Sequence, residues 1–307
     1  MHIPRDRCSL SHVAYKLASA DATLLFAGMS RSRRVGLGIE YVSTREYSLG
    51  DDTRRIDWIT TARSIDISGD YKLMVKEFEE EQLVETLIFL NIGYSMGFWD
   101  KLGVGVYSSS IALFTATTRN DRVSFTLSPS TVGEENIEFI RSNDPRNLIA
   151  AIPSKVCSSK FSRRGGLRGL VKQLPRLRRL RGILVISDYS HEFSEFRELV
   201  SVAKSLGKSI GVVFIVNRYE VSPPAEAANS LIKIEGSETV VETPLLDYIE
   251  ILKRHIRDIR ALLSSSIVPF IELYGLTHAR RQAHRIAMIY DSVRRKTVVA
   301  QYIRGKE

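Results

Sequence analysis

The chain has 307 residues, a formal net charge of +9 at pH 7 and a pI near 9.5. Its composition, 44% hydrophobic and 26% charged, is that of an ordinary soluble protein and excludes a fibrous or wholly disordered chain. No apolar run approaches the roughly 18 residues of a membrane-spanning helix. The charged first residues are followed by no continuous apolar run, so a signal peptide is not supported. We therefore expect a cytoplasmic protein without a transmembrane segment, although its basic charge leaves peripheral recruitment to a membrane open.

The two cysteines, Cys8 and Cys157, stand far apart in the sequence and belong to no CxxC or Cys/His cluster. This spacing argues against a zinc site and against a disulfide framework. We expect both thiols to be reduced.

The N-terminal part of the chain predicts a helix over about 10–26, then a polar, turn-rich segment with a hairpin signal at Ser68, Gly69 and Asp70. Apolar, β-prone runs predict strands at 83–90, 122–127, 182–187, 210–216 and 230–234. Between the third and fourth runs, a helical stripe capped by Ser190 and ended by Gly207 completes a βαβ unit. Strands that alternate with helices indicate an α/β fold with an open, mostly parallel sheet and helices on both faces.

After residue 242 the pattern is helical. Thr243 and Pro244 are expected to open one helix, and a basic helix is expected to begin near Thr277. Docking of this last helix on the sheet is the simpler expectation, and insertion into a groove of a partner is the alternative. The chain would thus contain an N-terminal segment (1–81), an α/β domain (82–242) and a C-terminal helical extension (243–307).

An ordered series of residues between Gly36 and Glu80 matches a known family signature. It comprises Gly36, Gly38, Glu40, Tyr41, Arg45, Glu46, Tyr47, Gly50, Asp51, Asp52, Arg54, Ile56, Asp57, Trp58, Ala62, Arg63, Val75, Lys76, Phe78 and Glu79. On this signature the chain resembles the domain of unknown function 58 family, in which a von Willebrand factor A-like domain follows. The resemblance spans roughly residues 36–234 and implies that the strand at 83–90 opens that domain.

The turn within this signature is rich in charge and allows two interpretations. It consists of Gly50, Asp51, Asp52, Arg54, Asp57 and Trp58. In the simpler interpretation, aspartates and arginines form ion pairs around a glycine turn, with Trp58 as their apolar anchor. In the other, the carboxylates form a catalytic or docking patch.

The resemblance also implies a metal site, because the A-like domain takes oxygen ligands from an Asp-x-Ser-x-Ser run, a threonine and a later aspartate. Here Asn91 replaces the first aspartate, Gly93 lacks the first hydroxyl, and Ser95 and Asp188 match. The threonine position falls at the glycines of Gly165-Gly166-Leu167. Such a site would hold Mg²⁺ weakly at best. We expect it to be empty, with Asn91 and Asp188 hydrogen-bonding around the loop.

The same loop suggests an enzyme as an alternative. Residues 93–97 read GYSMG after a strand, the pattern of a serine hydrolase nucleophile elbow. Asp188 and His278 follow Ser95 in the order of an α/β-hydrolase triad. No oxyanion loop precedes the elbow, so we favour a protein without enzymatic activity.

The densest charge feature is a run without acidic residues from Pro145 to Ser187. Its basic patch includes Arg163, Arg164, Arg168, Arg178, Arg179 and Arg181. Arginines bind phosphate groups, which makes a nucleic-acid-binding protein a second alternative. Few aromatic residues are interleaved for base stacking, so an acidic protein partner is preferred.

Members of this family commonly accompany MoxR-type AAA+ ATPases. The resemblance therefore implies an adaptor or scaffold that couples such an ATPase to protein clients during assembly or maturation. The expected partners are the ATPase and its clients, and no cofactor is expected beyond the weak Mg²⁺ site.

Overall fold

The computed structural model describes residues 6–30, 39–65, 69, 71–80, 84–128, 139–142, 144–159, 166–224, 226, 231–235 and 240–295. The chain divides into two compact units, one of Met1–Gly28 with Val84–Glu307 and one of Met29–Leu83. This division differs from the three regions expected from the sequence, because the N-terminal helix and the C-terminal elements both belong to the larger unit.

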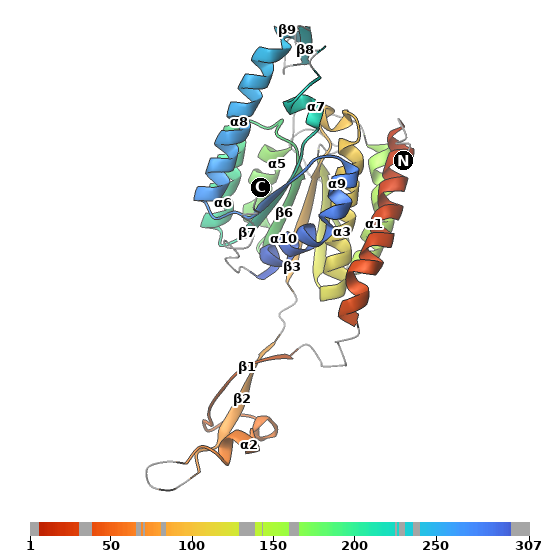
Figure 1. Ribbon diagram of the computed structural model, residues 1–307. Coiled ribbons are helices and arrows are strands. Elements are labelled where there is room, and N and C mark those ends of the chain that lie inside the picture. Colours follow the sequence, from red (N-terminus) through yellow and green to blue (C-terminus); the bar gives the residue numbers. More distant parts are fainter. Residues whose placement is uncertain are drawn as a thin grey trace. The chain divides into compact units, whose positions relative to one another are not determined.

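A six-stranded sheet forms the centre of the larger unit, in the order β10-β7-β6-β3-β4-β5 (Figure 1). Its strands are β3 Glu85–Asn91, β4 Arg122–Ser128, β5 Ile140–Ser142, β6 Leu180–Ser187, β7 Ser209–Ile215 and β10 Phe270–Leu273. Neighbouring strands are parallel from β10 to β4, and the short edge strand β5 is antiparallel to β4. The predicted fold class, an open and mostly parallel α/β sheet, is confirmed.

Helices cover both faces of this sheet (Figure 1). One face packs against α1 Arg7–Ser30, α3 Lys101–Arg119, α4 Pro145–Ser158, α9 Leu276–Arg281 and α10 Ala283–Arg295. The other packs against α5 Leu167–Gln173, α6 Phe193–Ser205 and α8 Leu245–Ser265. Ile88 and Leu90 of β3 join the first core and Leu87 and Phe89 the second, because successive side chains of a strand point to opposite faces.

The two strands at 231–235 and 270–273 differ from the expectation. The predicted strand near 230–234 exists as β8 Leu231–Glu235, but it pairs with β9 Val240–Pro244 in a separate antiparallel hairpin. The edge position in the main sheet belongs instead to β10, which no sequence signal predicted. A strand of four residues is too short to produce a clear periodic pattern.

The last helices pack on the sheet, which was the simpler of the two expectations for the C-terminal basic helix. The basic helix is interrupted at Gln282, which gives α9 and α10, and Ile286, Tyr290 and Val293 are buried. Gly182 of β6 lets α10 approach closely, since a Cβ there would stand 2.5 Å from a side-chain carbon of Val293.

Helix α1 is fastened to the larger unit by a covalent bond. Cys8 of α1 and Cys157 of α4 form a disulfide, with Cα atoms 4.9 Å apart. The expectation of reduced thiols is therefore wrong. Tyr107 of α3 and Arg280 of α9 both donate hydrogen bonds to Asp21, each at 2.8 Å, which holds the middle of α1 as well.

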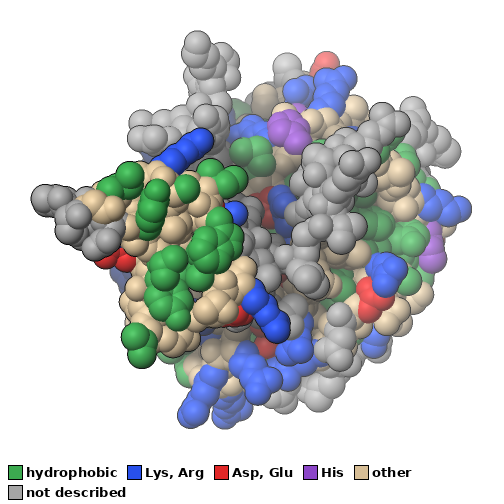
Figure 2. Space-filling view, turned by 90° about the horizontal axis from the view of Figure 1, so that it is seen from below, with side chains coloured by type: hydrophobic (Ala, Val, Ile, Leu, Met, Phe, Trp, Pro, Cys, Tyr) green, Lys and Arg blue, Asp and Glu red, His purple; other side chains and the backbone are tan. Residues whose placement is uncertain are grey.

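The smaller unit is an antiparallel ribbon with short helices. It contains β1 Ile39–Glu46, η1 Thr53–Arg55, α2 Trp58–Thr61 and β2 Met74–Glu80. An antiparallel bridge joins Ile65 to Tyr71 around Gly69, which has a φ of +87°, in agreement with the hairpin signal. Ser68 and Asp70 lie outside the described residues. Hydrophobic side chains gather on an exposed face of this unit (Figure 2).

None of the helices in the described parts of the chain is long and apolar enough to cross a bilayer.

Candidate functional site

The carboxylates of the signature turn mainly organise the smaller unit. Arg45 donates two hydrogen bonds to Asp51, both at 2.7 Å, and the backbone N–H of Ser48 donates a third at 2.8 Å. The Arg45 guanidinium lowers the pKa of Asp51 to about 2. Gly50 has a φ of +108°, a conformation that favours glycine. The ion-pair interpretation holds for Asp51.

The other charged and aromatic residues of the signature turn cap short helices or are exposed to solvent. Asp52 accepts from the Arg54 N–H at the start of η1, and Asp57 accepts from two N–H groups at the start of α2. Trp58 is 66% exposed, so its expected role as an apolar anchor is wrong. The Arg54 side chain is also exposed.

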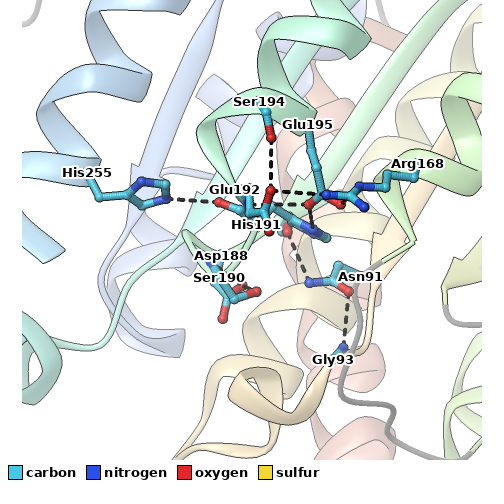
Figure 3. Close-up of polar contacts among 11 residues, drawn as sticks. Asn91, Gly93, Arg168, Asp188, Ser190, His191, Glu192, Ser194, Glu195 and His255 are labelled. Atoms are coloured by element: carbon cyan, nitrogen blue, oxygen red, sulfur yellow. Dashed lines mark hydrogen bonds and ion pairs between the residues drawn. The ribbon is translucent and has the colours of Figure 1, made fainter. Parts of the chain in front are cut away.

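The carboxyl edge of the sheet, where the parallel strands end, contains the loop that follows β3. Asn91 is fully buried; its side-chain N–H donates to Ser187 Oγ at 3.1 Å, and its oxygen accepts from the Gly93 N–H at 3.1 Å. Figure 3 shows both amide atoms of Asn91, the last residue of β3, engaged in hydrogen bonds. As expected, Asn91 fixes the loop through hydrogen bonds.

A buried lysine lies beside the predicted metal ligand. Lys101, the first residue of α3, donates from Nζ to Asp188 at 2.7 Å and to Glu220 of α7 (Arg218–Val221) at 2.9 Å. The side chains of Lys101 and Asp188 are each 3% exposed. Ser190 also donates to Asp188, at 2.6 Å from its hydroxyl. We name Lys101, Asp188 and Glu220 the Lys101 ion cluster.

Both partners of the buried pair are held in their charged forms. Burial alone would raise the pKa of Asp188, but the Lys101 ammonium and the Ser190 hydroxyl hold it below its ordinary value. Burial would likewise lower the pKa of Lys101, and the charges of Asp188 and Glu220 outweigh that effect and raise it. The cluster thus contains a permanent cation supplied by the chain.

The residues at this edge do not fit a divalent metal ion. Lys101 and Ser190 already donate to Asp188, the Asn91 oxygen is used within its loop, and Gly93 offers no side chain. At the predicted threonine position, a Cβ on Gly166 would stand 1.4 Å from Ser128 Oγ, so a larger residue has no space there. Across the described residues, no group of three or more His, Cys, Asp and Glu side chains could hold a metal ion.

The serine hydrolase triad is not assembled either. Asp188 pairs with Lys101, and His278 accepts a hydrogen bond at Nδ1 from the Tyr274 N–H at 3.2 Å. Ser95 lies in the short helix η2 Tyr94–Gly97, without the positive φ of a strained turn. The pocket beside Ser95 has a volume of only about 50 Å³, well below the roughly 300 Å³ of a small ligand pocket.

The predicted basic patch is dispersed. Arg168 pairs with Glu192 at 3.0 Å and with Glu195 at 2.9 Å, beside the buried ring of His191 (Figure 3). Arg178, Arg179 and Arg181 are exposed near the start of β6, at the opposite edge of the sheet. Arg163 and Arg164 lie outside the described residues.

Sequence reasoning missed Lys101 and Glu220. One signal was available: Lys101 opens a long helix, and a cation at a helix N-terminus is unfavourable unless carboxylates surround it. The identity of those carboxylates depends on the fold, since they lie 87 and 119 residues away in the sequence.

Comparison with known proteins identifies the family. A model described as "Protein of unknown function DUF58" matches residues 43–247, more than half of the chain. The chain belongs to the DUF58 family. The DUF58 match includes the signature from Arg45 onward and every strand of the six-stranded sheet except β10. No curated protein matches this DUF58 chain.

Two solved structures are similar at low identity. The conserved hypothetical protein BatB from Bacteroides thetaiotaomicron has 14% identity and a TM-score of 0.38, covering 68% of this chain and 100% of that one. An aerotolerance-related membrane protein from Bacteroides fragilis has 14% identity and a TM-score of 0.38, covering 67% and 98%.

Proposed function

We propose that this DUF58 protein is a non-enzymatic adaptor that works with a MoxR-type AAA+ ATPase on the assembly or maturation of client proteins. The observation that carries the proposal is a group of exposed aromatic side chains beside the Lys101 ion cluster, on η2, on α7 and on the segment between η2 and α3. We name Tyr94, Phe98, Trp99 and Tyr219 the aromatic rim; they are 50%, 46%, 63% and 51% exposed.

The aromatic rim is held in place by the loops at the carboxyl edge. Trp99 has a φ of 55°, which is unusual for a large residue, and its ring lies edge-on to Tyr219 with centroids 5.7 Å apart. The neighbouring residue Asp100 accepts from the Leu276 N–H at 2.8 Å and ties the loop to α9. Exposed Trp and Tyr side chains that are already ordered lose little entropy on binding and are enriched at the centres of protein interfaces.

The Lys101 ion cluster supports a binding function over catalysis. Its one ammonium group is hydrogen-bonded to both carboxylates, and the pocket beside Ser95 is too small for a substrate. What remains accessible is apolar surface, which is suited to a protein partner. The proposed binding surface rests on the exposed aromatic rim, whereas the choice of an AAA+ ATPase as partner rests on family analogy.

Binding of a MoxR-type ATPase to the full chain, measured by calorimetry, tests the proposal. Trp99→Ala should weaken binding by about tenfold or more, because interface tryptophans commonly contribute that much. Ile251→Ala, at a residue on α8 that is also 63% exposed, is the matched control and should have no effect. Absence of binding by the unmodified protein, or equal losses in both variants, would refute the proposal. Labelling of Ser95 by a fluorophosphonate would contradict its non-enzymatic part.

A further inference from the structure

A second concave site lies at the amino edge of the sheet, where β3, β4 and β6 begin. It is a cavity of about 560 Å³, and the charged residues of its described lining are Arg122, Arg141, Arg176, Arg178, Arg179 and Glu85. We name it the arginine cavity.

The five guanidinium groups of the arginine cavity have no side-chain partner among the described residues. By contrast, two partly buried arginines of the larger unit have carboxylate partners: Arg119 binds Asp291 at 2.6 Å, and Arg294 binds Asp121 at 2.6 Å. Glu85, the one carboxylate among the described residues of the lining, accepts a long hydrogen bond of 3.4 Å from Ser124. The cavity therefore combines a strong excess of positive charge with donors that are free to bind a ligand.

Three separate parts of the chain bring these arginines together. Arg122 opens β4, and antiparallel pairing places Arg141 of β5 opposite Ser124 of β4. Arg176 ends the short helix η3 Leu174–Arg176, and Arg178 and Arg179 follow it in the turn before β6. Strand pairing therefore fixes the spacing of two of the groups.

The turn that carries the remaining arginines is held by a buried lysine. Lys208 is 8% exposed and donates from Nζ to the Leu177 carbonyl at 2.7 Å and to the Leu180 carbonyl at 2.9 Å. These two bonds bracket Arg178 and Arg179 and fix the backbone between them. Because the backbone is fixed before a ligand arrives, less conformational entropy is lost on binding.

We propose that the arginine cavity binds a small anion that carries two or more phosphate groups. Guanidinium groups bind phosphate oxygens through paired hydrogen bonds, and several of them in one cavity suit several negative charges. The volume lies within the range of small-molecule pockets, which is about 300–1,000 Å³. Among the described residues, the lining contains no aromatic side chain, so these residues offer no platform on which a nucleic-acid base could stack.

Calorimetric titration of the full chain with pyrophosphate and with tripolyphosphate tests this inference. We expect saturable binding of one ligand per chain, and weaker binding of orthophosphate. The double variant Arg178→Gln/Arg179→Gln should weaken the binding of pyrophosphate by at least about tenfold. The control is Arg254→Gln/Arg257→Gln on α8, which removes the same charge from exposed positions and should leave affinity unchanged.

Three results would overturn the inference. Pyrophosphate and tripolyphosphate could give no saturable binding, or both double variants could weaken binding equally, which would indicate attraction to net charge only. The third result is that pyrophosphate does not bind, whereas a short DNA duplex binds the unmodified protein and binds the Arg178→Gln/Arg179→Gln variant more weakly. That result would assign the surface to a nucleic-acid backbone. Circular dichroism of each variant would establish that it is folded.

Discussion

The carboxyl and amino edges of the six-stranded sheet differ in whether their positive side chains are paired with carboxylates. At the carboxyl edge, a single lysine is buried and surrounded by two carboxylates within 2.9 Å. At the amino edge, the part of the cavity lining that the structure describes has five arginines and one carboxylate. The first arrangement satisfies its charge internally, and the second leaves its charge available to a ligand.

This difference shows why net charge alone could not locate a site. The formal charge of +9 includes both Lys101 and the cavity arginines, yet only the latter can attract an anion from solution. A buried ion pair acts on stability, whereas unpaired exposed charges act on binding and its salt dependence. The following predictions separate the two behaviours.

The largest effect is expected for Lys101→Met. Removing one partner of a buried pair leaves carboxylates uncompensated, so the free energy of unfolding should fall by about 3–5 kcal/mol in urea titration. Lys253→Met on α8, at an exposed position, should change it little. Adding Asp188→Asn to Lys101→Met should recover part of the loss; no recovery would show that the two side chains are not coupled.

The pH dependence of stability should follow the same cluster. The raised pKa of Lys101 gives stability that is present below the ordinary lysine value of about 10.4 and lost as pH rises beyond it. The lowered pKa of Asp188 gives stability that is present above about 3.9 and lost as pH falls below it. Thermal unfolding of the protein should show both losses. Lys101→Met should flatten the alkaline one, and an unchanged alkaline slope would contradict the assignment.

A much smaller effect on stability is expected at the amino edge. Arg178→Gln/Arg179→Gln should change the free energy of unfolding by no more than about 0.5 kcal/mol, because both side chains are exposed and unpaired among the described residues. Urea titration provides the measurement. A loss comparable to that of Lys101→Met would mean that these arginines hold the fold rather than a ligand.

Salt should affect the two edges differently. Raising NaCl from about 0.05 to about 0.5 M should weaken pyrophosphate binding at the arginine cavity, because exposed charges are screened. The destabilisation caused by Lys101→Met should hardly change over the same range, since a buried pair is screened much less. A binding affinity that does not respond to salt would argue against recognition through guanidinium groups.

The core of the fold could be predicted from the sequence because its strands are long apolar runs. β3, β4, β6 and β7 all lie within a residue or two of their predicted limits. β10 was missed because four residues carry little pattern, and β8 was assigned to the wrong sheet because a local run of residues does not specify its pairing partner.

The candidate site could be predicted only in part. Asn91, Ser95 and Asp188 were found through the family resemblance, and Asn91 and Asp188 do hydrogen-bond around their loops. Lys101 occupies the Asp188 carboxylate that a metal ion would need, but it approaches Asp188 only after strands and helices have packed. The pairing of Cys8 with Cys157 was missed for the same reason, since it requires α1 to lie beside α4.

The disulfide also has a consequence for how the chain responds to cutting. The bond joins positions 149 residues apart and closes a covalent ring that includes the whole smaller unit, Met29–Leu83. A single protease cut within that unit would open the ring without separating the fragments. Electrophoresis of the nicked protein should show one species of full mass until a reducing agent is added, and two afterwards. A cut in the backbone of the segment that carries the family signature would therefore not release either fragment while the disulfide is intact.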